Sequence, residues 1–344
     1  MSAPEQGADR TPGGHISYPE KETPELVELA TRLDALLRPE DGDAGGLGHV
    51  VLFDGQLPMV SIAVDPDVAG IQTLPSGGHD AAAVHERTGR QLYHLLTGLE
   101  PELAALRSGP LIRTVLRAPT GALFFYLIDT GAYLYGSTTR PDRIDAVDRQ
   151  LADAVNEIRG LVRLGRLNYG AFLTAGPSAS RPPTPAYGTA VPTSAPRPPA
   201  GVPADGDPAD HSGTVTLLRG SLGVGRLHYV AYYRDNQLAA TDDMLDDDRL
   251  APFFAMPTSG RERRRAQYLN IGQLLPSVVR RLDSTLRAVA GGHLLRLVLD
   301  VEQGAISYHA LPGKRYLIGV TLDQERVADA DRVLTGLGRD LAAD

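Results

Sequence analysis

Alternating hydrophobic positions in the middle of the chain predict β-strands. Runs at 111–117 and 122–128 are rich in β-branched, leucine and aromatic residues, and a third run covers 132–138. Glycine-bearing turns separate the runs, which favours an antiparallel meander. The hydrophobic period then changes from two to about 3.6 residues. The positions that share one helical face are Ile144, Val147, Leu151, Val155, Ile158 and Val162. We therefore expect three strands followed by an amphipathic helix.

The same pattern occurs again at 294–334. When Arg296 is aligned with Arg113, a shift of 183 residues, segments 111–151 and 294–334 match without a gap, and fourteen of forty-one positions are identical. The second helical face comprises Val327, Ala330, Leu334, Leu337 and Leu341. Self-similarity at a fixed, domain-sized spacing indicates two copies of one small domain.

The residues before the first meander predict a helix, a hairpin and a second helix. A cap at Thr23 and a proline at position 24 precede one apolar face formed by Leu26, Leu29, Leu33, Leu36 and Leu37. Runs 49–54 and 59–64 predict a hairpin, and leucine spacing predicts a helix over 80–107 that Pro101 breaks or kinks. The first copy thus reads helix, two strands, helix, three strands, helix.

The second copy differs at its start. Glycines within 214–227 predict that its first helix is missing, shortened or replaced by a strand. A hairpin is still expected over 227–241, followed by an insertion over 242–265. A strongly periodic helix then carries Pro276, which should kink or divide it.

Composition sets the boundaries and excludes several classes of function. The polar segment 1–22 is expected to be disordered, and the Pro/Ala/Ser-rich segment 175–212 to be a linker between domains 23–174 and 213–344. A net charge of −8 argues against general nucleic-acid or anionic-membrane binding. The absence of cysteine excludes disulfides, a thiol nucleophile and a cysteine zinc site. We expect a cytoplasmic protein without a membrane span.

No motif has the specificity of an enzyme signature. The sequence GSLGVG at 220–225 lacks the P-loop pattern and favours a turn. The aspartate run at 242–248 has carboxylates for a hard cation but no EF-hand spacing, which favours a solvated loop. The histidines and serines match no metal or hydrolase motif. We therefore expect a non-enzyme with no catalytic residue, cofactor or metal.

One dense basic cluster has two readings. It consists of Arg261, Arg263, Arg264 and Arg265, at the expected start of the long helix in the second copy. It is either a solvated helix start or a surface that docks on an acidic partner, and the pattern leaves both open.

The order of elements, with LIRTVLR, a glycine turn into ALFFYLI, YLYGST and a closing helix, resembles the roadblock/LC7 domain family. HLLRLVLDVEQGAISYHALPGKRYLIGVTLD in the second copy carries the likeness equally well. The resemblance implies an α+β fold made of two roadblock/LC7-like, profilin-like α/β sandwich domains. Each would have a five-stranded antiparallel sheet with helices on both faces.

The resemblance also implies how the copies associate. Roadblock domains pair through the edge of the third strand and pack their second helices together, and an exposed hydrophobic edge strand favours such pairing. The candidate interface residues on these strands are Arg113, Val115, Arg296 and Val298. Tandem copies would form a pseudo-dimer within one chain, because a linker raises the effective concentration of the partner domain.

For function, the resemblance implies a scaffold or regulator. Its expected partner is a small Ras-like GTPase or another roadblock protein, as for bacterial roadblock proteins of the gliding-regulator type, and homo-oligomers are possible. The alternative is a two-domain small-molecule sensor of profilin-like or PAS-like kind. A GTPase platform made by both copies would require both, whereas a sensor could keep a ligand in each.

Overall fold

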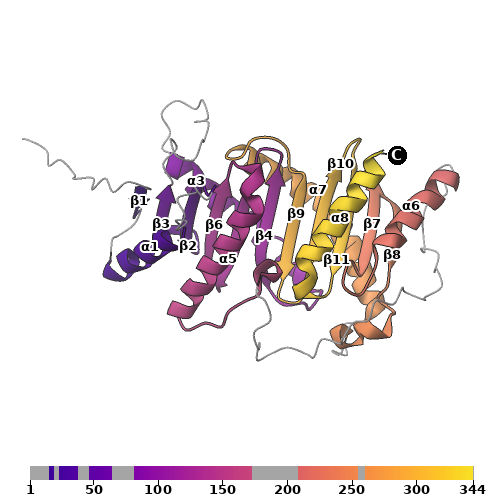
Figure 1. Cartoon of the computed structure of the whole chain (residues 1–344), viewed down its shortest axis with the longest axis horizontal. Helices are drawn as coiled ribbons and strands as arrows, with labels where there is room; N and C mark the ends of the chain where they lie inside the picture. Colours follow the sequence, from indigo (N-terminus) through magenta and orange to yellow (C-terminus); the bar gives the residue numbers. More distant parts are fainter. Residues whose placement is uncertain are drawn as a thin grey trace, which may run out of the picture.

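The strands of the protein form one antiparallel sheet. The structure is a computed structural model that describes residues 15–18, 23–37, 46–63, 81–172, 208–254 and 260–343. Eleven strands pair in a single continuous sheet, with helices packed against it (Figure 1). The fold is therefore α+β, as expected from the switch between strand and helix periods.

Both halves of the chain share a succession of helix, two strands, helix, three strands and helix. The first half, up to residue 172, contains β1 (His15–Ser17), α1 (Pro24–Leu37), β2 (His49–Asp54), β3 (Leu57–Ala63), α3 (Ala81–Thr97), α4 (Glu100–Ala104), β4 (Leu111–Ala118), β5 (Gly121–Asp129), β6 (Ala132–Thr138), the 3-10 turn η1 (Pro141–Arg143), α5 (Ile144–Leu161) and the 3-10 turn η2 (Tyr169–Ala171). The second half, from residue 208, contains α6 (Pro208–Ser221), β7 (Tyr229–Arg234), β8 (Gln237–Asp243), η3 (Asp248–Phe254), α7 (Arg261–Arg287), β9 (Arg296–Val301), β10 (Gly304–Leu311), β11 (Arg315–Thr321), η4 (Gln324–Arg326) and α8 (Val327–Ala343). The three strands and helix expected in each repeat are confirmed.

The order of strands in the sheet mirrors itself about its middle. The order is β1-β3-β2-β6-β5-β4-β9-β10-β11-β7-β8. Apart from β1, the order outward from the β4–β9 boundary is β4-β5-β6-β2-β3 on one side and β9-β10-β11-β7-β8 on the other, and these are corresponding strands of the two repeats. The two repeats therefore meet through their corresponding strands, β4 and β9.

The helices divide between the two faces of the sheet. Helices α5 and α8 cross one face, with α1 packed against α5 and α6 against α8 (Figure 1). Helices α3 and α7 pack against each other on the opposite face. The two faces of the sheet are therefore covered by different helices.

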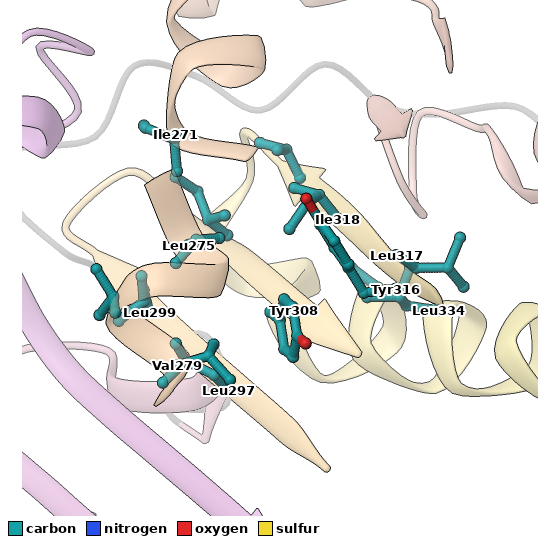
Figure 2. Close-up of a cluster of buried hydrophobic side chains, with 14 of the residues drawn as sticks. Ile271, Leu275, Val279, Leu297, Leu299, Tyr308, Tyr316, Leu317, Ile318 and Leu334 are labelled. Atoms are coloured by element: carbon teal, nitrogen blue, oxygen red, sulfur yellow. The ribbon is translucent and has the colours of Figure 1, made fainter. Parts of the chain in front are cut away.

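The alternation of strand residues is visible in the second half. Figure 2 shows Ile271, Leu275 and Val279 of α7 over β9 to β11, while Leu317 lies toward Leu334 of α8. Leu275, Leu317 and Leu334 are almost fully buried. The period-two pattern thus separates the side chains that pack under α7 from those that pack under α8.

The expectation for the start of the second copy is wrong. A full helix, α6, covers Pro208–Ser221, so it begins inside the segment assigned to the linker. Of the glycines in 214–227, α6 includes only Gly220, near its C-terminal end. A turn follows at 223–226, within the stretch where GSLGVG favoured one. Leu218 is completely buried, so packing against the core stabilises a helix that composition did not indicate.

Two further expectations change, and a third is confirmed. The N-terminal segment expected to be disordered contains β1, which pairs with β3 at one edge of the sheet. Helix α7 is not divided at Pro276, because buried neighbours such as Leu275 and Val278 hold it against the sheet. The predicted helix over 80–107 is broken as expected, and Pro101 lies in the first turn of α4, where its missing N–H has no helical partner to lose.

Candidate interaction site between the two halves

The two halves are joined by hydrogen-bonded pairing of β4 with β9. The strands run antiparallel, and Val115 lies opposite Val298. These valines are equivalent positions of the repeat, and both are buried. They therefore lie at the centre of the pairing, and the expected edge-to-edge association of the third strands is confirmed within one chain.

A buried charge cluster lies on the α5 side of this pairing. Arg113 donates from Nε to Asp148 of α5 at 3.0 Å and from Nη1 to Asp300 of β9 at 2.6 Å. Asp300 also accepts from the backbone N–H of Gly170 at 2.9 Å. The Tyr126 hydroxyl donates to the Asp148 carbonyl at 2.6 Å. The cluster ties β4, α5, η2 and β9 together.

The ionic states of this cluster depend on one another. Burial alone would lower the pKa of Arg113, but Asp148 and Asp300 outweigh it and raise that pKa. Burial raises the pKa of Asp300, and Arg113 opposes the rise. Asp300 is thus a buried carboxylate that depends on a cation from the other half of the chain.

On the opposite face, the junction is covered by α3, α4 and α7. Asn270 of α7 donates to Glu102 of α4 at 2.8 Å, and Arg264 of α7 donates from Nη1 to the Ser108 hydroxyl at 3.0 Å. Arg264 and Ser108 are both buried. Helices α3 and α7 also contact each other, so the expected packing of the second helices is confirmed.

Two glycines set how closely these helices approach the sheet. Gly89 of α3 and Gly272 of α7 are related by the repeat shift of 183 residues. A Cβ on Gly89 would lie 2.6 Å from Phe53, and a Cβ on Gly272 would lie 2.2 Å from the Tyr233 hydroxyl. Both halves thus use a mid-helix glycine to seat the helix on aromatic side chains.

The basic cluster of α7 is divided between internal contacts and solvent. Arg264 is buried, as described above. Arg265 donates to Asp243 at 2.7 Å and 2.8 Å and to Asp246 at 2.7 Å. Arg261 lies over the ring of Phe254 at 5.4 Å, and Arg263 is exposed. The interpretation of all four as one solvated or docking cluster is therefore wrong for Arg264 and Arg265.

The candidate interface residues come together only in part. Arg113, Val115, Arg296 and Val298 all lie in the β4–β9 pairing, whereas the α7 arginines lie on the other face. Sequence reasoning missed Asp148 and Asp300 as partners of Arg113, and Gly89 and Gly272 as contact points. The two glycines had a signal, because they match at the repeat shift, whereas nothing in the sequence indicated the role of Asp300.

The described residues offer no metal-binding group of three or more histidine, aspartate or glutamate side chains. None of the described helices is both long and apolar enough to cross a membrane. No protein-family model matches the sequence, and no curated protein is significantly similar to it.

Proposed function

We propose that the protein is a non-enzymatic scaffold that binds a small Ras-like GTPase on the α3–α4–α7 face. The observation that carries the proposal is the pairing of β4 with β9, which sets α3 beside α7. The surface that results is composed of both halves, so neither half presents it alone.

The resemblance to roadblock/LC7 domains supports this reading. That family is expected to pair through its third strands and second helices, and β4–β9 and α3–α7 associate in the same manner. The succession of helix, two strands, helix, three strands and helix occurs in both halves. On this reading the chain is a pseudo-dimer of two roadblock-like domains.

The charges on this face favour an acidic partner surface. Arg87 of α3 and Arg263, Arg280 and Arg281 of α7 have no ion pair among the described residues, and all four are exposed. The acidic residues of α7 are already engaged. Glu262 contacts Arg265 at 3.1 Å, and Asp283 contacts Arg287 at 2.9 Å. Helix α7 therefore keeps uncompensated positive charge on a chain whose net charge is −8.

Binding of the full-length protein to small GTPases from the same cell tests the proposal. Each GTPase is loaded with GDP or with a non-hydrolysable GTP analogue and titrated by biolayer interferometry. We expect saturable binding that weakens with salt, because exposed arginines act partly through long-range attraction. Arg280→Glu with Arg281→Glu should weaken it at least tenfold.

Arg332→Glu with Arg339→Glu is the matched control, because it changes the net charge equally and both residues are exposed arginines on α8, on the opposite face. It should leave the affinity unchanged. Equal loss in both variants would mean that net charge, and not the α3–α4–α7 face, controls binding. Absence of binding to every GTPase in either nucleotide state would refute the proposed partner.

A further inference from the structure

The first two turns of α3 are held on the sheet by few side chains. Residues 82–87 include no buried side chain, and buried side chains begin at Thr88. His85 connects this stretch to β6, because its Nδ1 atom lies 3.1 Å from the Tyr135 hydroxyl and 3.5 Å from the Ser137 hydroxyl. A helix start with so few buried contacts opens more easily than the core of the fold.

His85 is stacked on a second histidine. Its ring lies parallel to that of His49 on β2, with an interplanar angle of 4° and ring centroids 4.2 Å apart. His49 is 2% exposed, and its Nε2 atom lies 2.8 Å from the Ser61 hydroxyl on β3. Strand β1 extends the sheet beside β3 and places His15 opposite Ala63. The stacked pair thus connects α3 to β2, β3 and β6.

Among the described residues, no carboxylate raises the pKa of either stacked histidine. Their partners on β3 and β6 are hydroxyl groups, and burial raises the pKa of the Tyr135 hydroxyl, so it stays protonated. Glu86 and Arg87 are the neighbouring charged residues on α3, yet the pKa of His85 is lowered by burial alone. A proton on either ring therefore places an uncompensated charge in this cluster.

The pair is neutral at neutral pH and becomes unfavourable in acid. Burial lowers the pKa of His85 from 6.5 to about 4, and burial followed by repulsion from His85 lowers the pKa of His49. Because each pKa is lower in the folded protein than its ordinary value, the neutral pair contributes its full stability above pH 6.5. This contribution is lost as the pH falls toward 4.

The second half has tyrosines in the same place. Tyr268 of α7 is equivalent to His85 by the repeat shift of 183 residues, and Tyr229 at the start of β7 occupies the place of His49. Their ring centroids lie 5.2 Å apart. Burial raises the pKa of both tyrosines, so this pair stays neutral in acid. The start of α7 is also buried at Arg264 and Tyr268, so it is held by more contacts than the start of α3.

We propose that the His49–His85 pair is a pH-sensitive latch that holds the first two turns of α3 on the sheet at neutral pH and releases them in acid. Protonation of either ring places a positive charge against the other ring, in a site that disfavours charge. Movement of the helix start away from the sheet lets water surround the charged imidazole of His85, whereas β2 keeps its pairing with β3 and β6. The change is confined to one of the two helices that meet across the junction.

Hydrogen–deuterium exchange of the full chain tests the latch. It is read by mass spectrometry at pH 7.5 and pH 5 and corrected for the intrinsic exchange rate at each pH. A pKa of about 4 in the latched state against 6.5 in the released state favours release roughly thirtyfold more at pH 5 than at pH 7.5. We therefore expect the protection of residues 81–88 to fall by about tenfold or more, while β2 and β6 keep their protection. Equal protection of 81–88 at both pH values, or an equal loss in β2 and β6, would overturn the proposal.

His85→Gln separates the titration from other effects of acid. Glutamine can still donate to the Tyr135 hydroxyl but takes up no proton, so protection of residues 81–88 should be the same at both pH values. His94→Gln is the matched control, because His94 is an exposed histidine on the same helix, and it should keep the fall seen in the wild type.

Low protection of His85→Gln at both pH values would also support the latch, because it would show that the neutral imidazole holds the helix start. A fall in His85→Gln as large as in the wild type, or loss of the fall in His94→Gln, would overturn the proposal.

Discussion

Replacing Arg113 with methionine removes the cation that both Asp148 and Asp300 contact. Asp300 is fully buried and the Asp148 side chain is 2% exposed, so neither carboxylate can recover hydration. Removing one partner of a buried ion pair costs about 3–5 kcal/mol. Because two carboxylates lose their partner here, we expect a destabilisation near the upper end of that range.

Arg296→Met is the matched control, because Arg296 occupies the equivalent position of the second repeat. Its contact with Asp331 is partly exposed, 17% for each side chain, and it lies opposite Arg117. Loss of this partly exposed pair costs less than loss of a fully buried one, because water can reach the carboxylate that remains, and removal of the neighbouring like charge offsets part of the cost. Urea unfolding at pH 7.5, followed by circular dichroism, should therefore separate the two variants by several kcal/mol.

The pH dependence provides a second readout. Burial already raises the pKa of Asp300 in the folded protein, and Arg113 limits the rise. Without Arg113 this pKa rises further above its unfolded value of about 3.9. When the pKa of a carboxyl group is higher in the folded than in the unfolded protein, the fold is destabilised at pH values above the folded-state pKa. Stability recovers as the pH falls toward the unfolded-state pKa. The loss of unfolding free energy in Arg113→Met should therefore be smaller at pH 5 than at pH 7.5. Equal losses in Arg113→Met and Arg296→Met that do not depend on pH would refute the reasoning.

Two further predictions test packing and protonation. Gly272→Ala should destabilise the protein by about 1–3 kcal/mol in urea unfolding, because the new methyl group collides with Tyr233, which stacks on Tyr316. Gly336→Ala is the control: its methyl group meets open space on α8 and should stabilise the protein by up to about 1 kcal/mol. A gain of stability in both variants would contradict the packing argument. Burial lowers the pKa of His85 from 6.5 to about 4, so its neutral form stabilises the fold above pH 6.5 and that contribution is lost as pH falls toward 4, by up to about 3 kcal/mol. His85→Gln should flatten the stability profile over this interval, and an unchanged profile would show that other groups control it.

The sequence carried the local structure of the repeats but not their long-range contacts. Hydrophobic periods and the ungapped repeat predicted β4 to β6, β9 to β11 and their closing helices, whereas the strand edges that meet were expected only from the resemblance to roadblock/LC7 domains. They did not predict α6, because its N-terminal part has the composition of the preceding linker and its stability comes from packing of residues such as Leu218. They could not predict the role of Asp300 or the burial of Arg264, because Arg113 and Ser108, their partners, lie far away in the chain.

The central claim is that the two halves pair with each other within one chain through β4 and β9. The protein has no cysteine, so Val115→Cys with Val298→Cys introduces the only two thiols, at positions that lie opposite each other. Opposite residues of antiparallel strands have Cα atoms about 4.5–5.5 Å apart, within the range that a disulfide spans.

After mild oxidation at low protein concentration, we measure the oligomeric state by size-exclusion chromatography with light scattering and locate the bond by mass spectrometry of proteolytic peptides. The account predicts a monomer in which the peptides containing positions 115 and 298 are joined within one chain. Disulfide-linked dimers, or monomers with both thiols free, would contradict it.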